Sequence, residues 1–183
     1  MKNEKLMIEI EIPEGITPTL KDDVLFMKKE DKELQRKLNP IINLEIKENK
    51  IVVSAKRTTK EDRKNFGTMK AHINNMIRGL TEGFLYKLQA VFAHFPITII
   101  HEKDLNEIVV KNFLGEKKDR RIKIIENVDV KVNKHDIEIS SWDIEKAGQV
   151  AANLEKGTHV RNKDRRIFQD GIFIIEKPGR VFL

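Results

Sequence analysis

Residues 74–87 decide the fold, because the hydrophobic period changes within them; they read Asn74-Asn75-Met76-Ile77-Arg78-Gly79-Leu80-Thr81-Glu82-Gly83-Phe84-Leu85-Tyr86-Lys87. Up to Leu80 the apolar residues recur at helical spacing, and this spacing reaches back to Phe66. From residue 84 to residue 92 the chain carries aromatic and aliphatic side chains that favour a strand. We therefore expect Gly79 to end a helix, with a domain boundary between Gly79 and Gly83.

The residues before this helix predict strands. Residues 6–12 alternate between apolar and polar side chains, as a half-buried strand does, and Pro13 ends the alternation. Short apolar runs predict further strands at residues 24–26, 44–46 and 51–53. The helix is expected to open at Thr59 or Lys60, with acidic residues in its first turn, where negative charge favours the helix dipole.

The second half repeats this order of strands followed by one helix. Strands are expected at residues 84–92, 97–101, 108–113, 122–126, 128–132, 137–139 and 172–175. A helix between the last two is predicted by apolar residues on one face from Ile144 to Leu154, with Ser140 and Asp143 resembling a capping box. We expect an α+β fold of two tandem similar domains, each a small, mainly antiparallel sheet packed against one helix. Their expected ranges are 1–80 and 81–183.

Composition limits the classes of partner. The chain has 183 residues, of which 35% are charged, with a net charge of +6 and a pI near 9.4. A basic balance favours anionic partners, either nucleic acid or an anionic membrane. The absence of cysteine excludes disulfides, thiol catalysis and cysteine-ligated zinc. No apolar stretch reaches transmembrane length and the N-terminus lacks a signal-peptide pattern, so we expect a soluble intracellular protein.

The most strongly basic segment is residues 161–166, with four cations in six residues. These cations are Arg161, Lys163, Arg165 and Arg166, and His159 lies just before them. A basic loop beside a rigid strand is a common way to present cations to a phosphate backbone. A solvated loop before a hairpin is the alternative. After the cations, Asp170-Gly171 favours a tight turn with a positive φ at Gly171, and Phe168 is expected to pin this turn against the core.

A second basic cluster precedes a strand. Its cations are Lys117, Lys118, Arg120, Arg121 and Lys123, and Gly115 is expected to make the turn that directs them. Strand alternation places Arg121 and Lys123 on one face, opposite Ile122. A cationic sheet face suits phosphate contacts, and a solvated sheet face is again the alternative.

Other reactive side chains form no recognised set. None of the five histidines has a metal-ligand spacing with a partner, and the chain has no glycine-rich phosphate loop and no nucleophile elbow. We therefore predict no catalytic, cofactor-binding or metal-binding residues. Phe84 and Phe92 are expected in the core, and Tyr86 is open between a core position and an exposed one that stacks on a base.

Three blocks carry a resemblance to the archaeal and eukaryotic branch of the large-subunit ribosomal protein six family. The first is Arg166-x-Phe168-x-Asp170-Gly171 after the basic segment. The second combines residues 74–87 with Ala93-His94-Phe95-Pro96-Ile97, and the third is residues 111–117. Together the blocks cover roughly residues 60–175. Where the family usually carries a Gly-Pro-x-Gly turn, this chain has Lys29-Glu30-Asp31-Lys32.

The resemblance implies a function. Members of this family are non-enzymatic structural constituents of the large ribosomal subunit in the cytoplasm. Their C-terminal domain binds large-subunit ribosomal RNA near the sarcin–ricin loop and the stalk base, beside neighbouring ribosomal proteins. It implies no cofactor, no membrane and no small-molecule substrate. The alternatives are a free-standing RNA-binding or RNA-remodelling module, and a protein-interaction module with a basic surface.

Overall fold

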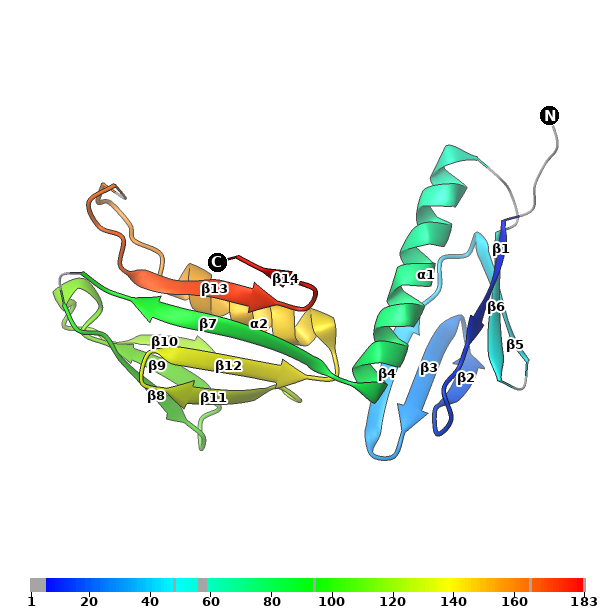
Figure 1. The fold of residues 1–183 in the computed structure, drawn as a ribbon, viewed down its shortest axis with the longest axis horizontal. Helices are drawn as coiled ribbons and strands as arrows, with labels where there is room; N and C mark the ends of the chain where they lie inside the picture. The colour runs from blue at the N-terminus through cyan, green and yellow to red at the C-terminus, as the bar shows by residue number, and fades with distance from the viewer. Residues whose placement is uncertain (1–5, 48, 56–58, 94, 165, 183) are drawn as a thin grey trace. The chain divides into compact units, whose positions relative to one another are not determined.

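The structure, a computed structural model, describes residues 6–47, 49–55, 59–93, 95–164 and 166–182. The chain forms two compact units, residues Met1–Glu82 (unit 1) and Gly83–Leu183 (unit 2). Each unit contains one long helix and antiparallel strands, so the fold is α+β, as the hydrophobic pattern predicts (Figure 1).

Unit 1 contains two three-stranded antiparallel sheets and α1 (Lys60–Thr81). The first sheet has the order β1-β6-β5, with β1 at Met7–Glu11, β6 at Lys50–Ala55 and β5 at Ile42–Lys47. The second has the order β2-β3-β4, with β2 at Thr17–Lys21, β3 at Val24–Lys29 and β4 at Lys32–Lys37. The helix packs on β6, β3 and β4, and its Ile73 is fully buried with Leu25, Met27 and Ile51.

The start of α1 agrees with the sequence pattern and its end does not. The Thr59 hydroxyl accepts a hydrogen bond from the Asp62 amide at 3.2 Å, and the Asp62 carboxylate accepts one from the Thr59 amide at 3.1 Å. This reciprocal pair satisfies two amides that have no partner within the helix. The expected end at Gly79 is wrong, because Gly79 is buried inside the helix and the helix continues to Thr81. The chain leaves the helix at Gly83, whose φ of +75° is accessible to glycine without a Cβ penalty.

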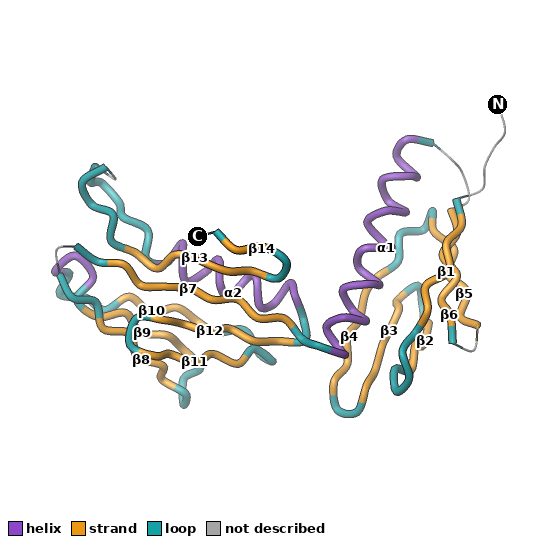
Figure 2. Tube along the Cα trace, viewed as in Figure 1, coloured by secondary structure: helices purple, strands orange, loops and turns teal. Residues whose placement is uncertain are grey.

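Unit 2 also contains two antiparallel sheets. The larger has the order β11-β12-β7-β13-β14. Its strands are β11 at Asp129–Asn133, β12 at Asp136–Ser141, β7 at Phe84–Val91, β13 at Gly171–Lys177 and β14 at Arg180–Val181. The smaller has the order β10-β9-β8, with β10 at Arg120–Lys123, β9 at Glu107–Lys111 and β8 at Thr98–Glu102. A short 3₁₀ turn at Phe113–Gly115 follows β9. The helix α2 (Ile144–Gly157) packs on β7, β12, β13 and β10 (Figure 2). The sequence predicts one sheet per domain, whereas the described residues form two sheets in each unit.

The N-cap of α2 is Asp143 and not Ser140. The Asp143 carboxylate accepts hydrogen bonds from the amides of Glu145 at 2.9 Å and Lys146 at 3.4 Å. The preceding Ser141 hydroxyl accepts a bond from the Asp143 amide at 3.1 Å and donates to the Asn127 carbonyl. The helix therefore begins with a carboxylate at its positive end, which is favourable for the helix dipole.

Tyr86 belongs to the core. Only 9% of its surface is exposed, and burial raises the pKa of its phenol. Its hydroxyl lies against Gly148 of α2, where a Cβ would stand 2.9 Å from the oxygen. The expected core position of Phe84 is confirmed, and Phe92 is half-buried against the core of unit 2.

The close approach of Tyr86 to Gly148 gives a test of core packing. We expect Gly148→Ala to lower the free energy of unfolding by about 1–2 kcal/mol, because overpacking outweighs the gain in helix propensity. Adding Tyr86→Phe removes the oxygen, leaves the nearest ring carbon 3.5 Å from the new Cβ and should recover most of this loss. The control is Gly67→Ala in α1, where nothing lies within 4 Å of the new Cβ, and it should stabilise by about 0.5–1 kcal/mol. Denaturant unfolding measures all four proteins; equal effects at the two glycines would contradict the packing argument.

Candidate RNA interface

The two basic segments meet at one end of unit 2. One segment, residues 158–170, joins α2 to β13, and the other, residues 112–119, joins β9 to β10. Figure 1 shows both at the end of the large sheet where β7 finishes. The charges of Lys163 and Arg161 contribute to lowering the pKa of the Glu116 carboxyl, which requires the two segments to be close. We call this surface the basic end of unit 2.

Asp164 organises the residues that carry the strongest cluster of cations, which we call the basic loop (residues 161–168). Its carboxylate accepts a hydrogen bond from the Arg166 amide at 2.9 Å. Its carbonyl accepts bonds from the amides of Ile167 at 3.1 Å and Phe168 at 2.9 Å. The loop therefore has its own hydrogen bonds, although it belongs to no helix or strand. A short polar side chain that bonds the backbone two residues ahead is typical of a tight turn.

The cations of the basic loop that the structure describes face solvent. Arg161, Lys163 and Arg166 are exposed, and none of their side chains forms an ion pair with a residue that the structure describes. The Lys163 ammonium lies 4.5 Å above the centre of the Phe168 ring. Arg165 lies outside the described residues. Three of the four predicted cations of this segment are thus positioned to meet an anionic partner.

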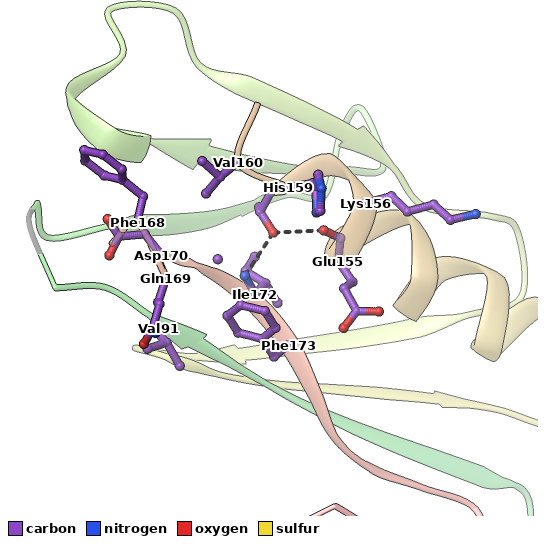
Figure 3. Close-up of a pocket in the computed structure, with 12 residues that line it drawn as sticks. Val91, Glu155, Lys156, His159, Val160, Phe168, Gln169, Asp170, Ile172 and Phe173 are labelled. Carbon is purple, nitrogen blue, oxygen red and sulfur yellow. Dashed lines mark hydrogen bonds between the residues drawn. The ribbon is translucent and has the colours of Figure 1, made fainter. Parts of the chain in front are cut away.

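Two buried polar side chains hold the base of the loop. The Thr158 hydroxyl, in a residue only 1% exposed, accepts a hydrogen bond from the Ile172 amide at 2.9 Å (Figure 3). It donates to the Leu154 carbonyl at 3.0 Å. The Asp170 carboxylate, in a residue 2% exposed, accepts a bond from the Ala93 amide at 2.5 Å. Thr158 thus joins the end of α2 to β13, and Asp170 joins β13 to the segment after β7.

Gly171 has a different role from the expected one. A positive φ at Gly171 is wrong, because this residue is the first of β13 and pairs with Val91 in regular strand geometry. The lack of a side chain matters instead: a Cβ would stand 3.1 Å from the Phe173 ring and 3.5 Å from the Thr158 carbonyl oxygen. Phe168 packs against the core of unit 2 as a half-buried residue. Gly115, in contrast, has a φ of +74° and makes the turn before the second basic cluster.

Arg120 joins the two basic segments. Its guanidinium donates two hydrogen bonds to the Glu116 carboxylate, at 2.5 and 2.8 Å, and one each to the carbonyls of Gly157 at 3.0 Å and His159 at 3.1 Å. It also lies 4.0 Å from the centre of the Phe113 ring. The side chain is only 19% exposed. Because the guanidinium is already engaged, Arg120 positions other cations, and its predicted contact with RNA stays a prediction.

The other cations of the second cluster differ in whether they form ion pairs. Arg121 and Lys123 are exposed on one face of β10 and Ile122 is buried on the other, as strand alternation predicts. The Arg121 guanidinium donates to Glu102 at 2.8 Å and to Glu107 at 3.4 Å, and Glu102 is the main cause of its raised pKa. No ion pair joins Lys117, Lys118 or Lys123, all exposed or nearly so, to another residue in the described part of the chain.

A groove of about 580 Å³ lies below the basic loop. The sequence singles out four residues of its wall in other roles: His159 as an RNA contact, and Phe168, Asp170 and Gly171 as parts of a turn. It does not single out Val91, Glu155, Lys156 or Phe173. These residues come from β7, α2 and β13, which tertiary packing alone brings together (Figure 3). One sign of this groove can be read from the sequence: Phe173 is a large aromatic residue at an outward-facing position of β13.

The described residues hold neither a metal cluster nor a helix of membrane-spanning character. No three His, Asp or Glu side chains among them gather as a metal site would require. No helix in the same part of the chain has the length and hydropathy needed to span a membrane.

Comparison with known proteins gives a consistent result. The family model described as ribosomal protein L6 matches residues 12–83 and 103–171, so it covers parts of both units, including the basic loop. The large ribosomal subunit protein uL6 of Methanococcus vannielii is 41% identical over 174 residues, 94% of each chain. The protein of the same description from Methanobrevibacter smithii is 40% identical over 170 residues, 92% of this chain and 94% of its own.

Two substitutions at Asp164 separate the effect of loop order on RNA affinity from the effect of net charge. We expect Asp164→Ala to weaken binding to protein-free large-subunit ribosomal RNA by roughly 2- to 10-fold, because the hydrogen bond that orders the loop is removed. Asp164→Asn removes the same negative charge but keeps an acceptor oxygen, so its affinity should equal or exceed that of the parent protein. A filter-binding titration at fixed salt compares the three proteins. An equal rise in affinity for both variants would show that charge alone matters at this position.

Glu116 gives a test of the link between the segments. Its hydrogen bonds to Arg120 are the main cause of a folded-state pKa below the ordinary carboxyl value. This contribution to stability is therefore complete above that ordinary pKa and is lost as the pH falls through the folded-state pKa. We expect Glu116→Gln to be less stable at neutral pH and to lose less stability on acidification. Denaturant unfolding across the acid range measures this; parallel curves for the two proteins would contradict it.

Proposed function

Because the chain belongs to the ribosomal protein L6 family, we propose that unit 2 binds large-subunit ribosomal RNA near the sarcin–ricin loop and the stalk base, beside neighbouring ribosomal proteins. The chain is a structural, non-enzymatic constituent of the cytoplasmic ribosome, as members of this family are. In this position it braces the RNA surface on which translational GTPases dock.

The observation that supports RNA binding by unit 2 is the convergence of two sets of exposed cations on its basic end. Arg161, Lys163 and Arg166 lie in the basic loop, and Lys117 and Lys118 lie in the adjoining segment. Cations on separate segments neutralise phosphates of more than one RNA strand and release their counterions, which supplies much of the affinity for RNA.

Preorganisation adds to this electrostatic attraction. Arg120, Asp164 and Thr158 hold the segments in place before RNA arrives. Little conformational entropy therefore remains to be lost on binding, so a larger part of the attraction appears as affinity. His159 and Lys123 are proposed as additional contacts at the edge of this surface, and Arg121 would contribute once its acidic partners are displaced.

The cations of the basic loop are tested by salt dependence. We expect replacement of Arg161, Lys163 and Arg166 by Ala to weaken binding to large-subunit ribosomal RNA. The slope of log affinity against log salt should fall by about one unit for each phosphate that the variant no longer neutralises. The matched control replaces three exposed cations of α1, Arg63, Lys64 and Lys70, by Ala; it changes the net charge equally and should leave the slope near that of the parent.

Two further results bear on the proposal. Circular dichroism of both triple variants should match the parent, because all six side chains are exposed. The parent chain should remain with large subunits through a high-salt wash, whereas a free-standing RNA-binding module would be released. An unchanged salt slope in the basic-loop variant would remove the basis for the proposed interface.

A further inference from the structure

The groove below the basic loop has an open apolar wall. Phe173 and Val91 are 38% and 43% exposed, which is high for large apolar side chains beside a buried sheet. Both face the groove, and the Phe173 ring lies over Gly171, the strand partner of Val91 (Figure 3). A Cβ at Gly171 would stand 3.1 Å from this ring, so the ring would have to shift by a few tenths of an ångström. The glycine therefore keeps a flat aromatic face available at the floor of the groove.

The rest of the groove combines polar, cationic and acidic groups. Glu155, Lys156 and His159 lie on the α2 side, and Phe168, Gln169 and Asp170 lie on the loop side. The Lys163 ammonium stands on the Phe168 ring, so a cation lies directly at the rim. Arg161 and Arg166 follow on the same exposed loop. The groove therefore offers a flat apolar floor next to a loop that carries exposed cations.

We propose that the groove receives one unstacked base of the RNA, which lies against Phe173 while its phosphates contact the basic loop. This inference rests on the proposed RNA binding and specifies one contact within it. Sequence-specific recognition of RNA commonly uses bases that leave the stack and lie on aromatic side chains. A volume of about 580 Å³ falls within the range of pockets that hold small ligands, so a base and part of its ribose fit.

A protein side chain is the competing occupant, and the charges favour RNA. Of the charged residues that line the groove, Lys156 is basic and Glu155 and Asp170 are acidic, and the Asp170 carboxylate is engaged by the Ala93 amide. The exposed cations Arg161, Lys163 and Arg166 on the adjoining loop outnumber the Glu155 carboxylate, and the Asp164 carboxylate among them is used by the loop backbone. An isolated phosphate is a poor occupant for another reason. The floor made by Phe173 and Val91 offers an anion no hydrogen bonds, whereas it offers a base a stacking surface.

Stacking and phosphate contacts respond differently to salt, which separates the two claims. We expect Phe173→Leu to weaken binding to protein-free large-subunit ribosomal RNA roughly 5- to 100-fold at fixed salt, because the flat stacking surface is removed. The salt slope should stay that of the parent, since no cation has been removed. Phe173→Tyr keeps the ring and should restore the affinity. The control is Leu85→Ala. Leu85 lies on the same face of β7 as Val91, is 41% exposed and does not line the groove, so this variant should bind like the parent.

Photo-crosslinking in assembled large subunits identifies the occupant. With p-benzoylphenylalanine in place of Phe173, we expect one dominant crosslink to an unpaired nucleotide. A crosslink to a neighbouring protein, a crosslink to a base-paired nucleotide or the absence of any crosslink would overturn the inference, and so would parent-like affinity of Phe173→Leu. These results leave the proposed function intact, because that proposal is tested separately, by the salt slope of the basic-loop variant and by retention of the parent chain on washed large subunits.

Discussion

The guanidinium of Arg120 is the interaction on which the basic end of unit 2 depends. It binds the Glu116 carboxylate with two donors and the carbonyls of Gly157 and His159 with another, while its plane lies over Phe113. Only a planar group with several fixed donors makes all of these contacts at once, so lysine is no substitute. The carbonyl of Gly157 is also at the negative end of the α2 dipole, where a cation is favourable. One half-buried cation thereby sets the position of several exposed ones.

The sequence predicts the features that depend on neighbours along the chain. The start of α1 at Thr59 follows from a capping pair three residues apart, and the outward position of Arg121 follows from strand alternation. The predictions that fail depend on distant residues. Gly171 is required by the ring of Phe173 and the carbonyl of Thr158, not by its own φ. Helix termination was assigned to Gly79 instead of Gly83, because both glycines follow the same apolar pattern and only the backbone angle distinguishes them.

The cations of the candidate site could be predicted from the sequence, but their ion-pair partners could not. The sequence identifies Arg120 and Arg121 as members of a basic cluster, but it does not show that Glu116, Glu102 and Glu107 are their partners. The groove was missed because its walls come from three elements of unit 2. Unit 1 shows a further departure. The turn Lys29-Glu30-Asp31-Lys32 joins β3 to β4 with a φ of +53° at Glu30, where the family usually has a glycine-rich turn. Glu30 and Asp31 balance Lys29 and Lys32, so this turn carries no net positive charge for a phosphate contact.

The hydrogen bonds of Asp164 have a consequence for the order of events during subunit assembly. A loop that is shaped by its own chain does not wait for RNA to give it a conformation. Under the proposed function, the adjustment on binding would fall mainly on the RNA, and the protein would select those RNA conformers that already match the spacing of its cations. Under the proposed function, unit 2 acts as a template: it slows the escape of correctly folded RNA and leaves misfolded RNA free to rearrange.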